Sequence, residues 1–130
     1  MNTATSANAY KQQQIMTASP EELTLMLYNG AIRFISESVA ALETGDMQAC
    51  HNKNMRAQDI VKEFMCTLDM QYEISQGWYK LYDYINYRLI QANLKKDKEM
   101  LLEAKGLLTE LRDTWFQAMK EIRPARAIGR

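Results

Sequence analysis

The stretch TASPEELTLMLYNGAIRFI, residues 17–35, combines a helix start with more apolar residues than one buried face requires. Ser19 can accept hydrogen bonds from free backbone N–H groups, and Pro20 suits the first helical position. Glu22 follows the capping serine by three residues, the spacing of a capping box. The sequence therefore predicts a long helix that begins at Pro20.

Two apolar stripes run along this predicted helix. The first has spacings of three and four and is assigned to the core; it contains Leu23, Met26, Leu27, Ala31, Phe34, Ile35 and Leu42. The second lies about 100° to 200° further around the helix; it contains Leu25, Tyr28, Ile32 and Val39. Two interpretations stay open: the helix is central and touches several neighbours, or part of the second stripe is left open for a partner.

The composition limits the classes of partner. A chain of 130 residues is expected to form one domain. Its 16 basic and 16 acidic residues create no long-range field that would favour nucleic acid or an anionic membrane. The N-terminus has no pattern of a secretory signal, and no apolar run approaches the roughly 20 residues of a membrane span. We therefore expect a cytoplasmic protein without nucleic-acid binding or membrane insertion.

Turn and cap residues divide the chain into segments. Residues 1–18 are rich in small and polar residues, which favours a flexible N-terminal arm. Gly45 can end the first long helix, and Asp46 and Asp97 can cap later ones. Pro124 is expected to end the last helix.

Three further apolar patterns of helical period follow the first, and no segment alternates with a period of two. The fold class is therefore predicted as all-α, an antiparallel four-helix bundle over residues 19–122. The short mobile arm, residues 1–18, leaves room for a small extra helix. Residues 123–130 are expected to form a disordered basic tail.

The residues that enzymes and metal sites require are scarce. His51 is the only histidine and has no Glu-x-x-His pattern, and neither a Cys-x-x-Cys pair nor a Gly-rich phosphate loop is present. We therefore predict no catalytic residue, no metal ligand and no cofactor. A histidine phosphotransfer domain is a small helical alternative, but those domains usually have lysine three residues after the histidine, where this chain has Asn54.

Several blocks together resemble one known family. They are AYKQQQ at 9–14, TASPEELTLMLYNGA at 17–31, LYDYINYRLIQANLKKD at 81–97 and LLTELRDTW at 107–115. In this order, over roughly residues 9–120, the chain resembles the flagellin export chaperone family, FliS. A block that many members carry before the third long helix is reduced here to Glu73 and Ile74, which leaves the shape of that corner open.

The resemblance implies a cytoplasmic chaperone, without ATPase activity, that binds the C-terminal segment of flagellin one to one. It would prevent premature polymerisation and help deliver flagellin to the flagellar type III export apparatus. The flagellin segment would wrap around the outside of the bundle in apolar grooves, and Tyr10 would cover an apolar site until the segment binds. The candidate contact residues are Tyr10, Leu25, Met26, Tyr28, Ile32, Met55, Ile60 and Met65.

Two alternatives remain beside this interpretation. A generic helical adaptor for another partner helix would show the same two-sided stripes, and only the family blocks separate the two classes. A weak homodimer of the free protein, formed through an open groove, is also compatible with the sequence.

Overall fold

A computed structural model describes residues 3–128, with side-chain surroundings from residue 8 to residue 121. The helices are α1 (Thr3–Thr17), α2 (Pro20–Glu43), α3 (Met47–Thr67), α4 (Glu73–Lys95) and α5 (Lys98–Ile128). No strand occurs among the described residues. The predicted all-α class is confirmed, and the extra helix for which the arm left room is present as α1.

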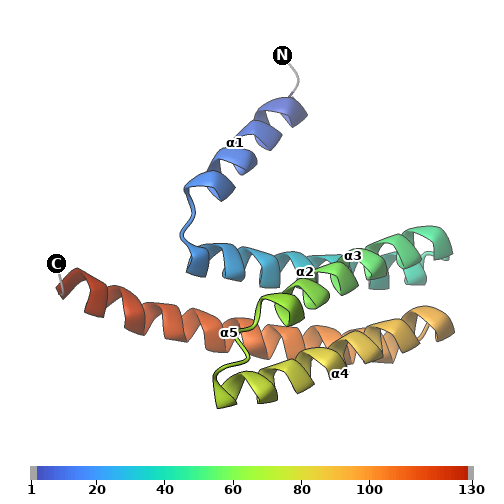
Figure 1. The fold of residues 1–130 in the computed structure, drawn as a ribbon. Coiled ribbons are helices and arrows are strands. Elements are labelled where there is room, and N and C mark those ends of the chain that lie inside the picture. The colour runs from blue at the N-terminus through green and yellow to red at the C-terminus, as the bar shows by residue number, and fades with distance from the viewer. Residues whose placement is uncertain (1–2, 129–130) are drawn as a thin grey trace.

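The four long helices form the predicted antiparallel bundle. Helix α2 packs on α3 and α5, and α4 packs on the same two helices, so consecutive helices are neighbours and the last closes on the first. Helix α1 leaves the bundle at the start of α2 and projects away from it (Figure 1). The side chains of residues 8–17 on α1 are exposed.

The predicted caps mark the starts of three bundle helices, α2, α3 and α5, whereas α4 begins without a side-chain cap. The Ser19 hydroxyl accepts a hydrogen bond from the Glu22 N–H at 3.2 Å, which confirms the start of α2. The Asp46 carboxylate accepts from the Ala49 N–H at 3.0 Å at the start of α3. Asp97 likewise accepts from the first N–H groups of α5, so short turns with local caps connect α2 to α3 and α4 to α5.

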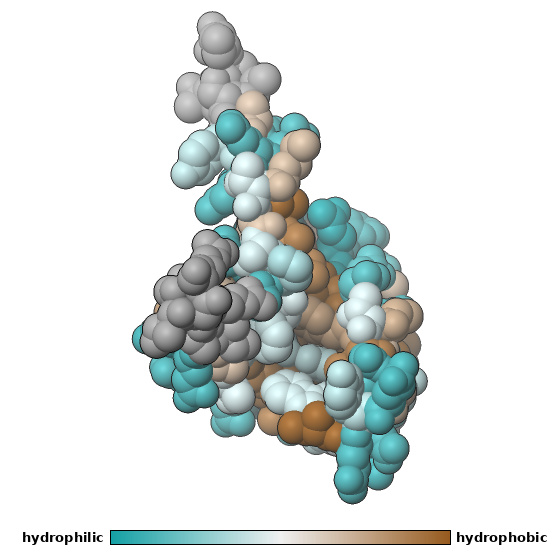
Figure 2. Space-filling view, turned by 60° about the vertical axis from the view of Figure 1, so that its left-hand side comes forward, coloured by the Kyte–Doolittle hydropathy of each residue, from teal (hydrophilic) through white to brown (hydrophobic). Residues whose placement is uncertain are grey.

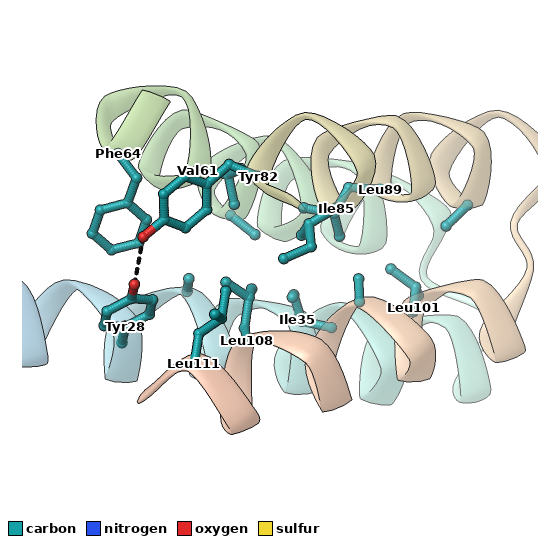
Figure 3. Packing of buried hydrophobic residues seen from close by; sticks show 14 residues of the cluster. Tyr28, Ile35, Val61, Phe64, Tyr82, Ile85, Leu89, Leu101, Leu108 and Leu111 are labelled. Carbon is teal, nitrogen blue, oxygen red and sulfur yellow. Dashed lines mark hydrogen bonds between the residues drawn. The ribbon is translucent and has the colours of Figure 1, made fainter. Parts of the chain in front are cut away.

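The core is a continuous layer of apolar side chains from all four bundle helices (Figure 3). Its fully buried large members include Ile35 on α2, Val61 on α3, Ile85 and Leu89 on α4, and Leu101 and Leu108 on α5. Complete burial of one such side chain contributes about 1.5 to 3 kcal/mol, which makes this layer the main source of stability.

Buried polar side chains tie α3 to its neighbours. The Asn54 amide donates to the Leu89 carbonyl of α4 at 3.0 Å, and its oxygen accepts from the Gln58 amide at 2.7 Å. The Ser38 hydroxyl of α2 donates to the Cys50 carbonyl of α3 at 2.8 Å. These bonds satisfy groups that would be costly to bury unpaired, and they restrict how α3 can slide or rotate.

The prediction that Pro124 ends the last helix is wrong for the backbone, because α5 continues to Ile128. A proline inside a helix removes one hydrogen bond and costs about 3 kcal/mol, but the helix can continue beyond it with a kink. Residues 129–130 of the predicted tail, and the side chains from residue 122 onward, lie outside the described residues. The division of the chain into an arm, a bundle domain and a tail stays a prediction.

Candidate functional site

The side of α2 that enters the core differs from the one predicted. Tyr28, Ala31, Ile35 and Ser38 are the buried residues of α2, and Tyr28 is only 1% exposed. Ala31 and Ile35 confirm part of the predicted core stripe, whereas Leu27 is 36% exposed. The buried seam therefore lies between the two stripes.

The apolar residues left over on α2 face a groove. Leu23, Met26, Leu27 and Gly30 line it from α2, and Ile15 lines it from α1. Its volume is ≈ 700 Å³, within the size range of ligand pockets. Brown, apolar side chains gather below the projecting α1 and continue down this face of the molecule (Figure 2). We call this hollow the α1–α2 groove.

Gly30 lies next to Ile60 of the neighbouring helix α3 at the edge of the α1–α2 groove. A Cβ atom at this position would lie 3.5 Å from Cδ1 of Ile60, an ordinary van der Waals contact. With only hydrogen at Gly30, the Ile60 side chain is not covered there by an α2 side chain. The apolar surface of the groove therefore extends from α2 towards α3.

The end of the groove away from α1 is positively charged. Arg33 lines the groove beside Gly30, and its Nε lies 3.6 Å from a carboxylate oxygen of Glu37, one turn further along α2. That carboxylate also pairs with Lys53 of α3 at 2.9 Å. The groove thus has apolar side chains along α2, Lys11 and Gln14 on its α1 side, and the Arg33 guanidinium at its opposite end.

An aromatic cluster closes the core near the start of α2. The hydroxyls of Tyr28 and Tyr82 lie 2.5 Å apart, and the Phe64 ring packs against both rings at centroid distances of 4.5 Å and 5.3 Å (Figure 3). Burial raises the pKa of both tyrosine hydroxyls above the ordinary value. The pair therefore stays protonated at neutral pH and acts as a structural contact.

Two smaller hollows lie at this end of the bundle, and the aromatic cluster itself lines the larger one. They have volumes of ≈ 330 Å³ and ≈ 200 Å³ and share Ile74 and Trp78 as lining residues. Ile74 is 70% exposed because it lies in the first turn of α4 at this open end. Trp115 of α5 closes one side and donates its indole N–H to the Glu21 carbonyl at 3.0 Å.

The predicted contact residues do not share one surface. Met26 lines the α1–α2 groove, and Ile60 lies beside it under Gly30. Met55 and Met65 are each five residues from Ile60, which places them about 140° away around α3. They are half-buried on another side of that helix.

Leu25 and Ile32 are half-buried on α2 and lie about 160° from Leu27 and Gly30 respectively, outside the groove. Tyr10 is 69% exposed on α1. Tyr28 is only 1% exposed, because its ring packs against Phe64 and its hydroxyl meets that of Tyr82. It also lines the hollow of ≈ 330 Å³ at this end of the bundle, and its contact with a partner stays a prediction.

Groove residues of α2 that were not predicted as contact residues include Leu23, Leu27, Gly30 and Arg33. Leu23 and Leu27 were assigned to the core because they share the helical period of buried neighbours. Gly30 was a usable signal, since a glycine inside a helix costs stability relative to alanine and often marks a close approach.

No group of three or more His, Cys, Asp and Glu side chains that could hold a metal ion occurs among the described residues. The Nδ1 atom of His51 lies 2.8 Å from the Asn93 amide nitrogen, which links α3 to α4. Within the described helices, none is long and apolar enough to cross a membrane.

Comparisons with known proteins point to one family. The family model of flagellar protein FliS matches residues 2–122 of this chain. The flagellar secretion chaperone FliS of Bacillus subtilis is 43% identical over 118 residues, which cover 91% of this chain and 89% of the relative. The chaperone of the same name from Salmonella typhimurium is 35% identical over 124 residues, with 90% and 92% of the two chains covered.

A solved structure supports the fold independently. The crystal structure of a bacterial flagellar chaperone superimposes with a TM-score of 0.73 and covers 92% of this chain and 99% of that one. Its sequence identity is 20%, so this likeness concerns the helical arrangement alone.

Proposed function

This chain belongs to the FliS family, a family of flagellar secretion chaperones and not of enzymes, and from that premise we propose that it binds the C-terminal segment of flagellin. The complex forms one to one in the cytoplasm. Binding prevents premature polymerisation and aids delivery of flagellin to the flagellar type III secretion apparatus. We call the bound flagellin segment the client.

The observation that carries this proposal is the α1–α2 groove. Leu23, Met26 and Leu27 line a hollow of ≈ 700 Å³ on the outside of a bundle whose core is already complete without them. Apolar side chains at spacings of three and four receive the apolar face of an amphipathic helix. Methionine adapts to more than one side-chain shape, which suits a partner that folds as it binds.

Binding of the client requires no nucleotide hydrolysis in this proposal. A flagellin terminus that is disordered before assembly buries apolar surface on a preformed bundle, and ordering it costs about 2 to 5 kcal/mol of the gross gain. While it is held in the groove, the same apolar face is unavailable for contacts with other flagellin molecules. Release to the export apparatus then returns the segment to a disordered state.

Other predicted contact residues enter the proposal as flanking surface. A client that wraps around the bundle contacts Ile60 next to the groove, Leu25 and Ile32 on another side of α2, and Met55 and Met65 on α3. All five are half-buried, so each keeps part of its surface accessible.

In this proposal helix α1, which projects away from the bundle in Figure 1, folds back over the groove until the client binds. Tyr10, Ile15 and Met16 are 69%, 47% and 85% exposed, and Ile15 already lines the groove. Deletion of residues 1–16 should therefore raise the affinity for the client and increase the binding of an apolar dye. Unchanged affinity and unchanged dye binding would contradict the covering role.

Titration calorimetry with a peptide of the flagellin C-terminal segment from the same organism tests the proposed function. A one-to-one complex with a negative heat-capacity change would establish burial of apolar surface. Leu27→Ser should weaken binding, and Leu102→Ser on α5 is its matched control, because the two leucines are 36% and 37% exposed. Sedimentation of the free chain would show whether a weak homodimer competes for the groove.

A folded chain that does not bind the peptide would contradict the client assignment. The helical-adaptor alternative would then take its place, since the groove would still fit a partner helix. Equal loss of affinity in Leu27→Ser and Leu102→Ser would also contradict a role specific to the α1–α2 groove.

A further inference from the structure

Beyond its apolar contacts, we infer that the charged end of the α1–α2 groove recognises a carboxylate on the client, through Arg33, Lys53 and Arg56 around the Phe34 ring. This inference rests on the proposed function, because the occupant is the same segment. It requires the client to carry a negative charge at a defined distance from the residues that make the apolar contacts.

Three cations surround one aromatic ring at this end of the groove. The guanidinium carbons of Arg33 and Arg56 each lie 5.1 Å from the Phe34 centroid, and the Lys53 ammonium lies 5.6 Å from it. The negative face of an aromatic ring attracts cations at such distances. The ring therefore gathers positive charge from both α2 and α3.

The charges in this cluster do not balance. Glu37 is the only carboxylate of a described residue that pairs with the cluster, with Lys53 at 2.9 Å and with Arg33 at 3.6 Å. No Asp or Glu oxygen among the described side chains lies within 4.0 Å of a nitrogen of Arg56. Three cations face one anion, which leaves an excess of two positive charges.

Arg33 joins the cluster to the groove, because it both lines the hollow and contacts Phe34. Leu27 and Phe34 are seven residues apart on α2, which is two turns or roughly 10 Å. A client helix that lies along α2 would therefore carry an acidic residue about two turns from the apolar side chain above Leu27.

Arginine favours a carboxylate as the complementary group. Its planar guanidinium donates two parallel N–H bonds to the two oxygens of a carboxylate, which adds direction to the attraction. The neighbouring apolar groove favours a peptide over a free anion, since one amphipathic segment can fill both parts. Partial exclusion of water by the bound segment strengthens the charge contact.

The test compares the affinities of two chaperone forms for two client forms in low salt. In Arg33→Gln/Arg56→Gln, binding of the flagellin C-terminal peptide should weaken about tenfold relative to the unchanged chain. Peptides in which single Asp or Glu residues are replaced by Asn or Gln should include one that loses a similar factor. For that peptide, Arg33→Gln/Arg56→Gln should cause little further loss of affinity, because the carboxylate that the arginines contact is already absent.

Lys120→Gln is the matched control, because the Lys120 ammonium lies 4.6 Å from the Phe116 centroid on α5 and repeats the chemistry outside the groove. This variant should bind like the unchanged chain, and added salt should reduce the affinity of the unchanged chain more than that of the double variant. Undiminished binding by the double variant in low salt would overturn this inference alone. Absence of any binding by the unchanged chain would contradict the proposed function and this inference with it.

Discussion

Tyr28 and Tyr82 meet through hydroxyls 2.5 Å apart, although 54 positions separate them in the chain. The contact joins α2 to α4, which lie diagonally across the bundle and share no packed face. Phe64 of α3 packs against both rings, so three helices meet in one aromatic cluster (Figure 3). This contact places α2 with Tyr28 inwards and leaves Leu27 on the groove side.

Tyr82→Phe should destabilise the bundle by about 1 to 3 kcal/mol, because it leaves the buried Tyr28 hydroxyl without its partner. The double variant Tyr28→Phe/Tyr82→Phe removes both polar groups and should cost less than the sum of the single variants. Urea denaturation of the unchanged chain, Tyr28→Phe, Tyr82→Phe and the double variant gives the coupling energy between the two hydroxyls. Strictly additive losses would show that the two hydroxyls do not depend on each other.

Alkaline pH should destabilise the chain through the same pair. Burial raises the pKa of Tyr28 and Tyr82, so the folded state keeps protons that the unfolded chain releases. Their stabilising contribution is complete below the unfolded pKa of about 10 and is lost as the pH rises above it. Denaturation between about pH 9 and 11 should show a shallower loss for the double phenylalanine variant. Equal slopes in the two chains would contradict this.

Gly30→Ala should stabilise the chain by about 0.5 to 1 kcal/mol, because alanine is the better helix former. Its Cβ would only contact Ile60 at 3.5 Å. Gly30→Leu should keep the fold but fill the groove and block the client, as measured by calorimetry. Gly106 of α5 is the matched control, since no atom lies within 4 Å of a Cβ there, and Gly106→Leu should leave binding unchanged.

Asn54→Ala should cost about 2 to 3 kcal/mol of stability, because it removes the bond to the Leu89 carbonyl and leaves the buried Gln58 amide without its acceptor. On the same helix, Gln48 donates to Asn52 at 3.0 Å with both side chains exposed. Asn52→Ala should therefore change stability by no more than about 0.5 kcal/mol. Similar losses in both variants, measured by urea denaturation, would contradict a special role for the buried amide network.

Local signals in the sequence determined where three of the four bundle helices begin. Ser19, Asp46 and Asp97 act as caps at the positions that their spacing predicted, because a cap depends only on the next two or three backbone N–H groups. The helical period of the apolar residues likewise determined the all-α class. Pro124 was the exception, since the helix continues through it.

The sequence could not determine which way each helix faces. Periodicity placed Leu27 and Tyr28 on stripes about 100° apart on the helix, but the direction of the neighbouring helices decides which of them is buried. Packing of Tyr28 against Phe64 and Tyr82 turned that seam inwards, and Leu27 remained beside the groove. Tertiary structure alone decided which α2 side chains line the α1–α2 groove, because their exposure depends on contacts between residues that lie far apart in the chain.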